Sequence, residues 1–485
     1  MPVFLAVDLG AESGRVLRGS LRDGRLAVDE VHRFVNRPVA LPDGLHWDVL
    51  ALFADLSAGI DAAAAGGRID GVGIDAWGND FALLDRSGGL IGNPWHYRDR
   101  RTRSSLDLIA ARVGAGEIYR TTGTAPLPIN TASQLVAAEG SAQLEAAERL
   151  VLLPDLFGYW LTGQVVTEQT IASTSQLLDV GTRTWATGVI DKLGIPRRLF
   201  DFAVVPAGTT VGRLREHPAV PLWTVAGHDT ASAVVAVPAG TESFGYISSG
   251  TWSLVGLELD APVLTDEARL AGFSNEAGVD GTIRFLRNGT GLWLLQRCRA
   301  AWRSPSHGEP SYGDLVAAAE TAPAFRGLVD PDDPAFVAPP DMPARLVAAC
   351  RRGGQPVPAD RAAVVRCVLD SLACKHRWSL ERAEWLSGRR ADVVHVVGGG
   401  AANTLLCQLT ADLTGRPVLA GPVEATAVGN LLVQARAAGE LGSVAEIREV
   451  VARSLPPRRY EPRASDLAED AYARFLTLLD RGDKI

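Results

Sequence analysis

The chain has 485 residues, more than one hydrophobic core usually supports, so two domains are expected. Hydrophobic residues make up 47% and charged residues 21% of the sequence, as in ordinary globular proteins. The formal net charge of -8 argues against nucleic acid and anionic membranes as partners, because both attract basic surfaces. No run of about eighteen apolar residues appears, so no membrane span is expected.

The cysteines and the N-terminus are typical of a protein of the reducing cytoplasm. The five cysteines form no Cys-x-x-Cys pair, which argues against a structural zinc site. Cys350 and Cys367 flank a turn-rich segment, a geometry that allows a bridge, although two free thiols suit the compartment better. The N-terminal run reaches Asp8 without a basic region, so we expect a strand there and not a signal peptide.

Short apolar runs between Gly-rich turns predict an α/β fold. In the first half, strands are predicted over residues 3–7, 16–21, 26–34, 69–75, 81–84 and 222–226. Helices are predicted there over residues 46–65, 106–113, 134–147, 154–161 and 230–237.

The second half continues the same alternation. Strands are predicted over residues 244–248, 251–259, 393–397 and 418–420. Helices are predicted over residues 292–301, 361–386, 403–414, 426–438 and 466–479. Residues 325–358 are rich in Pro, Asp and Gly, and we expect them to form a long surface excursion.

The first two predicted strands form a hairpin whose turn could bind phosphate. Gly10 and Gly14 allow a tight turn that presents N–H groups to an anion, and Ser13 can add a hydroxyl donor. Asp8, at the strand end, is placed to hold a hydrated divalent cation. An ordinary Gly-rich hairpin is the alternative interpretation.

Asp229 is the candidate catalytic carboxylate. It follows the predicted strand 222–226 and Gly227-His228, and it opens the helix predicted over 230–237. A carboxylate at a strand end can face a cleft and accept a proton from a substrate hydroxyl. The alternative is that Asp229 only caps this helix, since Asp is a preferred cap residue.

A second strand-turn-strand, with Ser249-Gly250 at its tip, echoes the hairpin at Asp8. Two such hairpins, one in each half, suggest a duplicated α/β architecture that faces a shared nucleotide. Gly398-Gly399-Gly400 follows an apolar strand, and glycines there let a flat ring approach the backbone closely.

The ordered set of motifs resembles the FGGY family of carbohydrate kinases, within the actin, hexokinase and heat-shock ATPase superfamily. The likeness spans nearly the whole chain, and Asp330-Pro331-Asp332-Asp333-Pro334 is similar to the members that act on L-rhamnulose. The matching segments are residues 8–15, 73–78, 96–99, 154–157, 227–230, 246–254, 291–296, 330–334, 341–343, 398–400 and 420–425.

The resemblance implies two actin-like (ribonuclease H-like) α/β domains with a ligand cleft between them. Turn chemistry at Pro238-Ala239-Gly240 puts the expected boundary there. Residues 1–240 would carry the sugar site, the catalytic base and the first phosphate hairpin. Residues 241–485 would carry the second phosphate hairpin and the adenine site.

The resemblance also implies a cytoplasmic phosphotransferase of rhamnose catabolism that transfers the γ-phosphoryl group of ATP to the C1 hydroxyl of L-rhamnulose. Asp229 would be the base and Asp8 would hold Mg²⁺ through water. The nucleotide would be contacted by Ala11, Glu12, Ser13, Gly14, Arg15, Thr251, Gln296, Gly399 and Gly400. The sugar would be contacted by Gly78, through its backbone, and by His228, Asp229, Thr230 and Asn288. The small ketose and ATP are the expected partners of a monomer or homodimer.

Two positions depart from the family pattern. Asn79 stands where an apolar residue is expected, and Gly289-Thr290 replaces a bulkier apolar pair. Both lie in segments expected to contact the sugar, so they bear on the preferred ketose. Other functions remain open: a kinase for fuculose, ribulose or xylulose, an actin-like chaperone, or a catalytically silent actin-like sugar sensor. A silent sensor would be expected to lose its base, whereas Asp229 is present.

Overall fold

The computed structural model describes residues 1–240, 243–304, 306, 308–337 and 339–482, so Thr241 and Glu242, at the predicted boundary, lie outside the described residues. The chain divides into two compact units. Unit 1 comprises Met1–Pro238, Glu258–Phe285 and Ala425–Leu455, and unit 2 comprises Ala239–Leu257, Leu286–Glu424 and Pro456–Ile485. Unit 1 therefore includes two segments that follow residue 240 in the sequence.

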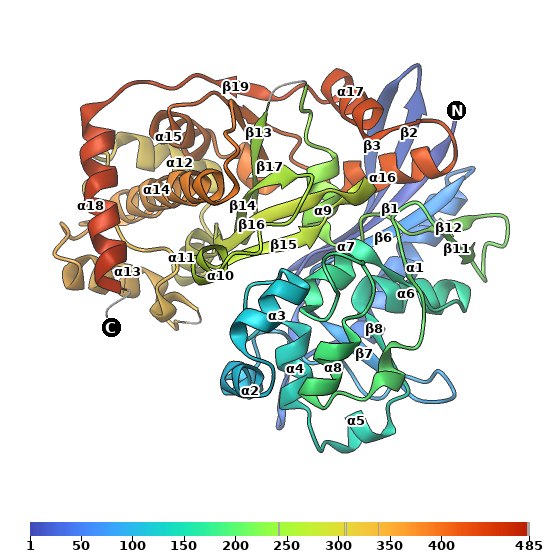
Figure 1. The fold of residues 1–485 in the computed structure, drawn as a ribbon. Helices are drawn as coiled ribbons and strands as arrows, with labels where there is room; N and C mark the ends of the chain where they lie inside the picture. Colours follow the sequence, from blue (N-terminus) through green and yellow to red (C-terminus); the bar gives the residue numbers. More distant parts are fainter. Residues whose placement is uncertain (241–242, 305, 307, 338, 483–485) are drawn as a thin grey trace. The chain divides into compact units, whose positions relative to one another are not determined.

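Unit 1 is built on a six-stranded sheet (Figure 1). Its strands are β1 (Val3–Leu9), β2 (Ser13–Arg22), β3 (Arg25–Val35), β6 (Gly71–Ala76), β11 (Thr210–Arg213) and β12 (Pro221–Trp223). The order is β11-β12-β6-β1-β2-β3, and β12 is shorter than the strand predicted over 222–226. β1 is buried throughout, as its continuous apolar run predicts. It pairs antiparallel with β2 and parallel with β6, so Asp8 lies opposite Arg15 on one neighbour and Asp75 on the other.

Two helices, α9 (Asp229–Val235) and α16 (Ala425–Ala437), pack against each other in unit 1. A Cβ atom at Gly429 would lie 1.9 Å from the carbonyl oxygen of Ser232, so glycine permits this close approach. His228 occupies the N-cap position of α9, and Asp229 is the first helical residue. Capping in the strict sense therefore does not account for Asp229, although an acid in a first helical turn is favourable.

The remainder of unit 1 consists of short strand pairs and helices; some of them surround a separate apolar cluster, whereas α1 and α17 pack against β3 of the large sheet. The strands are β4 (Pro38–Leu41), β5 (Gly44–Trp47), β7 (Phe81–Leu84), β8 (Arg149–Leu152), β9 (Thr167–Glu168) and β10 (Val204–Val205). The helices are α1 (Val49–Ala65), α2 (Ser105–Arg112), α3 (Ala115–Thr122), α4 (Thr131–Ala137), α5 (Ala142–Ala146), α6 (Leu153–Thr162), α7 (Gln169–Ala172), α8 (Thr187–Leu193), α10 (Asp266–Leu270) and α17 (Val444–Ser454). Single 3₁₀ turns are η1 (Arg100–Thr102), η2 (Ser173–Ser175), η3 (Arg197–Phe200) and η4 (Val279–Gly281).

The second large sheet has seven strands. They are β13 (Phe244–Ser249), β14 (Trp252–Leu259), β15 (Phe273–Ala277), β16 (Ile283–Thr290), β17 (Val393–Val397), β18 (Val418–Ala420) and β19 (Arg458–Tyr460). Their order is β15-β16-β14-β13-β17-β18-β19, and the division between the units passes through β14 and β16. β13 pairs antiparallel with β14 and parallel with β17, as β1 does with β2 and β6. This repetition agrees with the predicted duplication.

The helices of unit 2 surround α14 (Arg361–Ser387), a 27-residue helix. The others are α11 (Trp293–Ala301), α12 (Tyr312–Thr321), α13 (Met342–Arg352), α15 (Thr404–Thr414) and α18 (Asp466–Gly482), with 3₁₀ turns η5 (Pro334–Phe336) and η6 (Gly399–Ala402). α14 packs against α11, α12, α13, α15 and α18 (Figure 1). Their apolar faces form one buried cluster.

The surface excursion predicted over 325–358 is wrong in large part. Phe336, Met342 and Leu346 are buried in the core of unit 2, and α13 lies within the segment. The Pro and Asp residues that suggested a loop are helix-start signals here. Asp341 caps α13 by accepting a hydrogen bond from the N–H of Ala344, and a proline occupies the first turn.

Two helix predictions also need correction. The helix predicted over 46–65 begins at Val49, because Asp48 caps it. The helix predicted over 134–147 is divided into α4 and α5, because Gly140 adopts a φ of 72° between them. Across the described residues, no helix combines the length and the apolar character needed to cross a membrane.

Candidate active site

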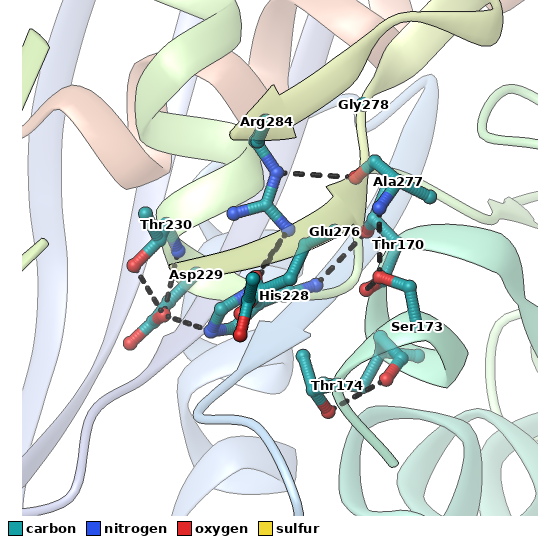
Figure 2. Close-up of polar contacts among 12 residues, drawn as sticks. Thr170, Ser173, Thr174, His228, Asp229, Thr230, Glu276, Ala277, Gly278 and Arg284 are labelled. Atoms are coloured by element: carbon teal, nitrogen blue, oxygen red, sulfur yellow. Dashed lines mark hydrogen bonds and ion pairs between the residues drawn. The ribbon is translucent and has the colours of Figure 1, made fainter. Parts of the chain in front are cut away.

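Asp229 has two carboxylate oxygens in different environments (Figure 2). Oδ1 accepts hydrogen bonds from the backbone N–H (2.6 Å) and Oγ1 (3.2 Å) of Thr230, and it lies 3.3 Å from Nε2 of His228. Among the described residues, none donates to Oδ2, and 31% of the side chain is exposed. The structure therefore groups three predicted site residues and leaves one oxygen of Asp229 available as a proton acceptor.

The backbone before Asp229 is fixed by buried polar groups. The N–H of Gly227 donates to Oε2 of Glu168 (2.9 Å), and the N–H of His228 donates to Oγ1 of Thr170 (3.2 Å). Burial raises the pKa of Glu168, and four hydrogen bonds to the carboxylate partly offset that effect. These contacts hold the turn that presents the carboxylate of Asp229.

His228 contacts a buried ion pair that the sequence analysis missed. Glu276 and Arg284 join at 2.9 Å, and each lies 3.1 Å from Nδ1 of the His228 ring. Burial raises the pKa of Glu276, but Arg284 and His228 outweigh it, so this pKa lies below its ordinary value. The two residues lie in β15 and β16, which the sequence analysis did not predict, and the polar sequence of β15, Phe-Ser-Asn-Glu-Ala, gives no signal of burial.

Asp8 and Asp75 place two carboxylates on neighbouring strands. Nη2 of Arg15 donates to Oδ2 of Asp8 at 2.6 Å, and Nδ2 of Asn430 donates to Oδ2 of Asp75 at 2.6 Å. No described residue donates to the buried Oδ1 of Asp75. Burial, and then the charge of Asp8, raise the pKa of Asp75 well above its ordinary value.

This pair of carboxylates fits a hydrated cation better than a fully protein-ligated one. Mg²⁺ usually keeps several waters and takes only one or two carboxylates. Within the described part of the chain, no group of three or more His, Cys, Asp or Glu side chains could hold a metal ion directly. The orphaned oxygen of Asp75 could accept a hydrogen bond from such a water, so the residues present fit the predicted role of Asp8.

The predicted phosphate turn is tight and well packed. The N–H of Gly10 donates to the carbonyl of Ser13 (2.9 Å), and Glu12 at the tip is exposed. A Cβ atom at Gly14 would lie 2.2 Å from the ring of Phe34. Gly14 is therefore required for packing against that ring, a reason that the sequence pattern did not suggest.

Asn79 has a backbone conformation that explains its departure from an apolar residue. Its φ is 74°, a region that Asn tolerates and β-branched residues avoid. Its N–H donates to Oγ1 of Thr174 (3.1 Å), and its carbonyl accepts from Oγ1 of Thr131 (2.6 Å). At neighbouring Gly78, a Cβ atom would lie 3.0 Å from the side chain of Thr174.

Asp80 anchors the segment that carries Gly78 and Asn79. Its Oδ2 accepts from the indole N–H groups of Trp47 (2.6 Å) and Trp77 (2.9 Å), and its Oδ1 accepts from Nε2 of Gln134 (2.7 Å). Burial raises the pKa of Asp80 to about 6, although these hydrogen bonds act in the opposite direction. The sequence analysis did not single out Asp80.

Unit 2 contains a cavity of about 580 Å³ that brings together two predicted nucleotide residues, Gln296 and Gly399. Nε2 of Gln296 also donates to Oγ1 of Thr251 at 3.3 Å. Gly400 is not among the lining residues; a Cβ atom there would lie 2.0 Å from Oγ of Ser249, so Gly400 serves close packing.

Helix α12 forms one wall of this cavity through Tyr312, Val316 and Glu320, and the sequence analysis missed it. The side chain of Ser311 caps the helix by accepting from the N–H of Asp314. A serine followed three residues later by an acid is a helix-start signal that could have revealed it.

Asn288, the predicted sugar contact of unit 2, lies in β16 between two anchored residues. Asp332 accepts from Nη1 of Arg287 (2.8 Å) and from the N–H of Thr290 (2.7 Å). Lys375 lies 3.1 Å from the same carboxylate. Burial raises the pKa of Asp332, but the charges of Lys375 and Arg287 outweigh it and hold that pKa well below its ordinary value.

Comparison with known proteins decides the family. Residues 3–236 match the N-terminal domain, and residues 245–438 the C-terminal domain, of the FGGY family of carbohydrate kinases. The chain belongs to this family. The family inferred from the ordered motifs is thereby confirmed, and the chain is a carbohydrate kinase.

Full-length relatives of this FGGY kinase include two curated rhamnulokinases. That of Bacteroides thetaiotaomicron is 42% identical over 482 residues, which cover 97% of this chain and 98% of the relative. That of Pectobacterium carotovorum is 41% identical and covers 98% of this chain and 96% of the relative.

Solved structures of the family share the fold. The crystal structure of gluconate kinase from Lactobacillus acidophilus matches with a TM-score of 0.78 and 16% identity, over 100% of this chain and 98% of that chain. At this identity the likeness concerns the fold alone. It agrees with the predicted two-domain, actin-like α/β architecture.

Proposed function

We propose that this FGGY kinase transfers the γ-phosphoryl group of ATP to the C1 hydroxyl of L-rhamnulose, giving L-rhamnulose 1-phosphate and ADP. The observation that carries the proposal is the 42% identity to a rhamnulokinase over 97% of the chain. The arrangement around Asp229 supports it, because a phosphotransferase needs an acceptor for the proton of the attacking hydroxyl.

In the proposed mechanism, Asp229 is the base. Thr230 and His228 engage Oδ1 and fix the carboxylate. Oδ2 would take the proton of the C1 hydroxyl while the oxygen of that hydroxyl forms its bond to phosphorus. Little covalent help is needed in phosphoryl transfer, so orientation of the hydroxyl is the main contribution of Asp229.

The nucleotide would be bound by backbone groups and a few side chains. We assign the phosphates to Ala11–Arg15 and Thr251, and the remainder of the nucleotide to the cavity lined by Gln296 and Gly399. Asp8 would hold Mg²⁺ through water, and the bound ion would neutralise phosphate charge. Gly400 would support the cavity indirectly, because it packs closely against Ser249.

The sugar would be bound by Gly78, His228, Thr230 and Asn288. Gly78 belongs to a segment held by the buried carboxylate of Asp80, and Asn288 to one held by the half-buried carboxylate of Asp332, which suits residues that must discriminate hydroxyl positions. We place the reaction in the cytoplasm, with the chain as a monomer or homodimer.

Product identification tests this function. The purified chain would be incubated with L-rhamnulose and MgATP, and the product analysed by mass spectrometry and ³¹P NMR. We expect one ADP per sugar monophosphate, with the phosphate coupled to the C1 protons. A product phosphorylated at another carbon, or no product from L-rhamnulose, would contradict the assignment.

A further inference from the structure

The buried contact between Arg284 and His228 bears on how the base is oriented. Arg284 is 0% exposed, and its Nε donates to the carbonyl of Ala277 at 3.1 Å. Its Nη2 makes a hydrogen bond to Nδ1 of His228 at 3.1 Å (Figure 2). Burying a guanidinium costs desolvation free energy, so we expect a role of Arg284 beyond packing.

The chemistry of arginine restricts the proton on the histidine ring. A guanidinium can only donate hydrogen bonds, so Nδ1 of His228 must accept from Arg284. In a neutral imidazole, one nitrogen accepts and the other carries the proton. In a neutral ring Nε2 therefore carries the proton, and it faces Oδ1 of Asp229 at an ion-pair distance of 3.3 Å.

Glu276 could compete for the same nitrogen, since its Oε2 lies 3.1 Å from Nδ1. Oε2 lies at ion-pair distance from both Nδ1 of His228 and Nη2 of Arg284, whereas the contact between Arg284 and the ring meets hydrogen-bond geometry. Glu276 compensates the charge of Arg284 at 2.9 Å, and the hydrogen bond to the ring belongs to Arg284.

We propose that Arg284 is a positioning residue of this kinase: it holds His228 as the Nε2–H tautomer, which anchors Oδ1 of Asp229 and leaves Oδ2 as the proton acceptor. The opposite tautomer would turn a lone pair of Nε2 toward the carboxylate and loosen it. This inference rests on the proposed function for its catalytic consequence, but the tautomer itself does not depend on the substrate.

The tautomer can be read directly by NMR on the protein labelled with ¹⁵N-histidine. The chain has 8 histidines, and the spectrum of His228→Gln identifies the signals of His228. We expect an unprotonated Nδ1 and a protonated Nε2 in the wild type. A protonated Nδ1 in the wild type would overturn the proposal without reference to activity, so this outcome is distinct from a failure of the proposed function.

Paired variants then test the consequence. Arg284→Met combined with Glu276→Leu removes the donor and the opposing charge together, so no buried ion is left unpaired. We expect mixed tautomers and a kcat lower by on the order of tenfold, with the KM for ATP unchanged. Unchanged kcat, or a lower kcat with the Nε2–H tautomer retained, would overturn the proposal.

Two controls separate positioning from general destabilisation. Arg366→Met with Asp370→Leu removes another buried ion pair, of 2.8 Å, from α14 and should leave the His228 signals unchanged. Arg284→Lys retains a donor, so it should preserve the Nε2–H tautomer and restore most of kcat. If Arg284→Lys folds but shows a protonated Nδ1, the assignment to Arg284 is wrong.

Discussion

Asp229 combines one engaged carboxylate oxygen with one that lacks a donor, which makes its replacement informative. Asn in its place keeps the shape and can still accept from Thr230, but it cannot take a proton. We expect Asp229→Asn to lower kcat roughly a hundredfold or more. Calorimetric titration should show nearly unchanged binding of ATP and ketose. Turnover close to wild type would show that Asp229 is not the base.

Asn79 should be replaceable by Gly but not by Val. At a φ of 74°, an ordinary L-residue is strained, whereas Gly adopts this conformation freely. We expect Asn79→Val to lower the free energy of unfolding by about 1–2 kcal/mol, and Asn79→Gly to stay close to wild type. Urea unfolding of both variants measures the difference. Equal losses in both would contradict an origin in backbone strain.

Cys350 and Cys367 lie with their sulfur atoms 3.7 Å apart, and both thiols are buried and free. The hydrogen bond with Cys350, together with burial, raises the pKa of the Cys367 thiol, which disfavours the reactive thiolate. Thiol counting on denatured protein that was never reduced should find all five thiols. A count of three would show that the pair forms a bridge.

At this scale, the sequence predicts the residues that lie in short motifs and misses those that act through distant partners. Asp229 and Gly78 were proposed as site residues because their immediate neighbours form recognisable patterns. Arg284 lies 56 residues from His228, and no local pattern links them. Asp80 was missed for the same reason, since its partners come from three different segments.

Among the elements, β16 and the segment around Asp332 form a unit whose role can be tested. Asp332 anchors the residues on both sides of Asn288, so its loss should disturb the sugar contact more than the nucleotide. We expect Asp332→Ala to raise the KM for L-rhamnulose by on the order of tenfold, with the KM for ATP within about twofold of wild type. Steady-state kinetics with each substrate varied in turn measures both.

The next residue provides a matched control. Asp333 belongs to the same motif, but it caps η5 and pairs with Arg352, away from β16. Asp333→Ala should therefore leave the KM for L-rhamnulose unchanged. Equal effects of the two substitutions would show that the motif acts only through general stability.

Elements with a single strong signal were predicted closely. β17 and β18 have the predicted limits, because each is a short apolar run bounded by turn residues. Errors arose where Pro, Gly and Asp mark helix starts instead of loops, as at Asp341 before α13. Local composition does not distinguish a helix start from a loop. A helix is distinguished by an apolar face that packs into the core, and the residues that complete this core lie far along the chain.

For the whole molecule, β1 and β13 pair with their neighbours in the same way, so the chain has two similar strand-turn-strand hairpins, which we propose bind phosphate. The fold follows from this duplication, but the sugar does not. Relatives with the same fold include proteins named for gluconate, xylulose and glycerol. The fold alone therefore does not set substrate choice, and we propose that the residues around Gly78, Asp229 and Asn288 do.

Whether this chain is an L-rhamnulose kinase can be decided from kcat/KM for a panel of ketoses at saturating MgATP. A site that hydrogen-bonds a given hydroxyl penalises an epimer, because its buried polar groups then lose their partners. We expect L-rhamnulose to give the highest kcat/KM, with L-fuculose, D-ribulose and D-xylulose each lower by about tenfold or more. A higher value for any of these three would contradict the account and leave only the family assignment.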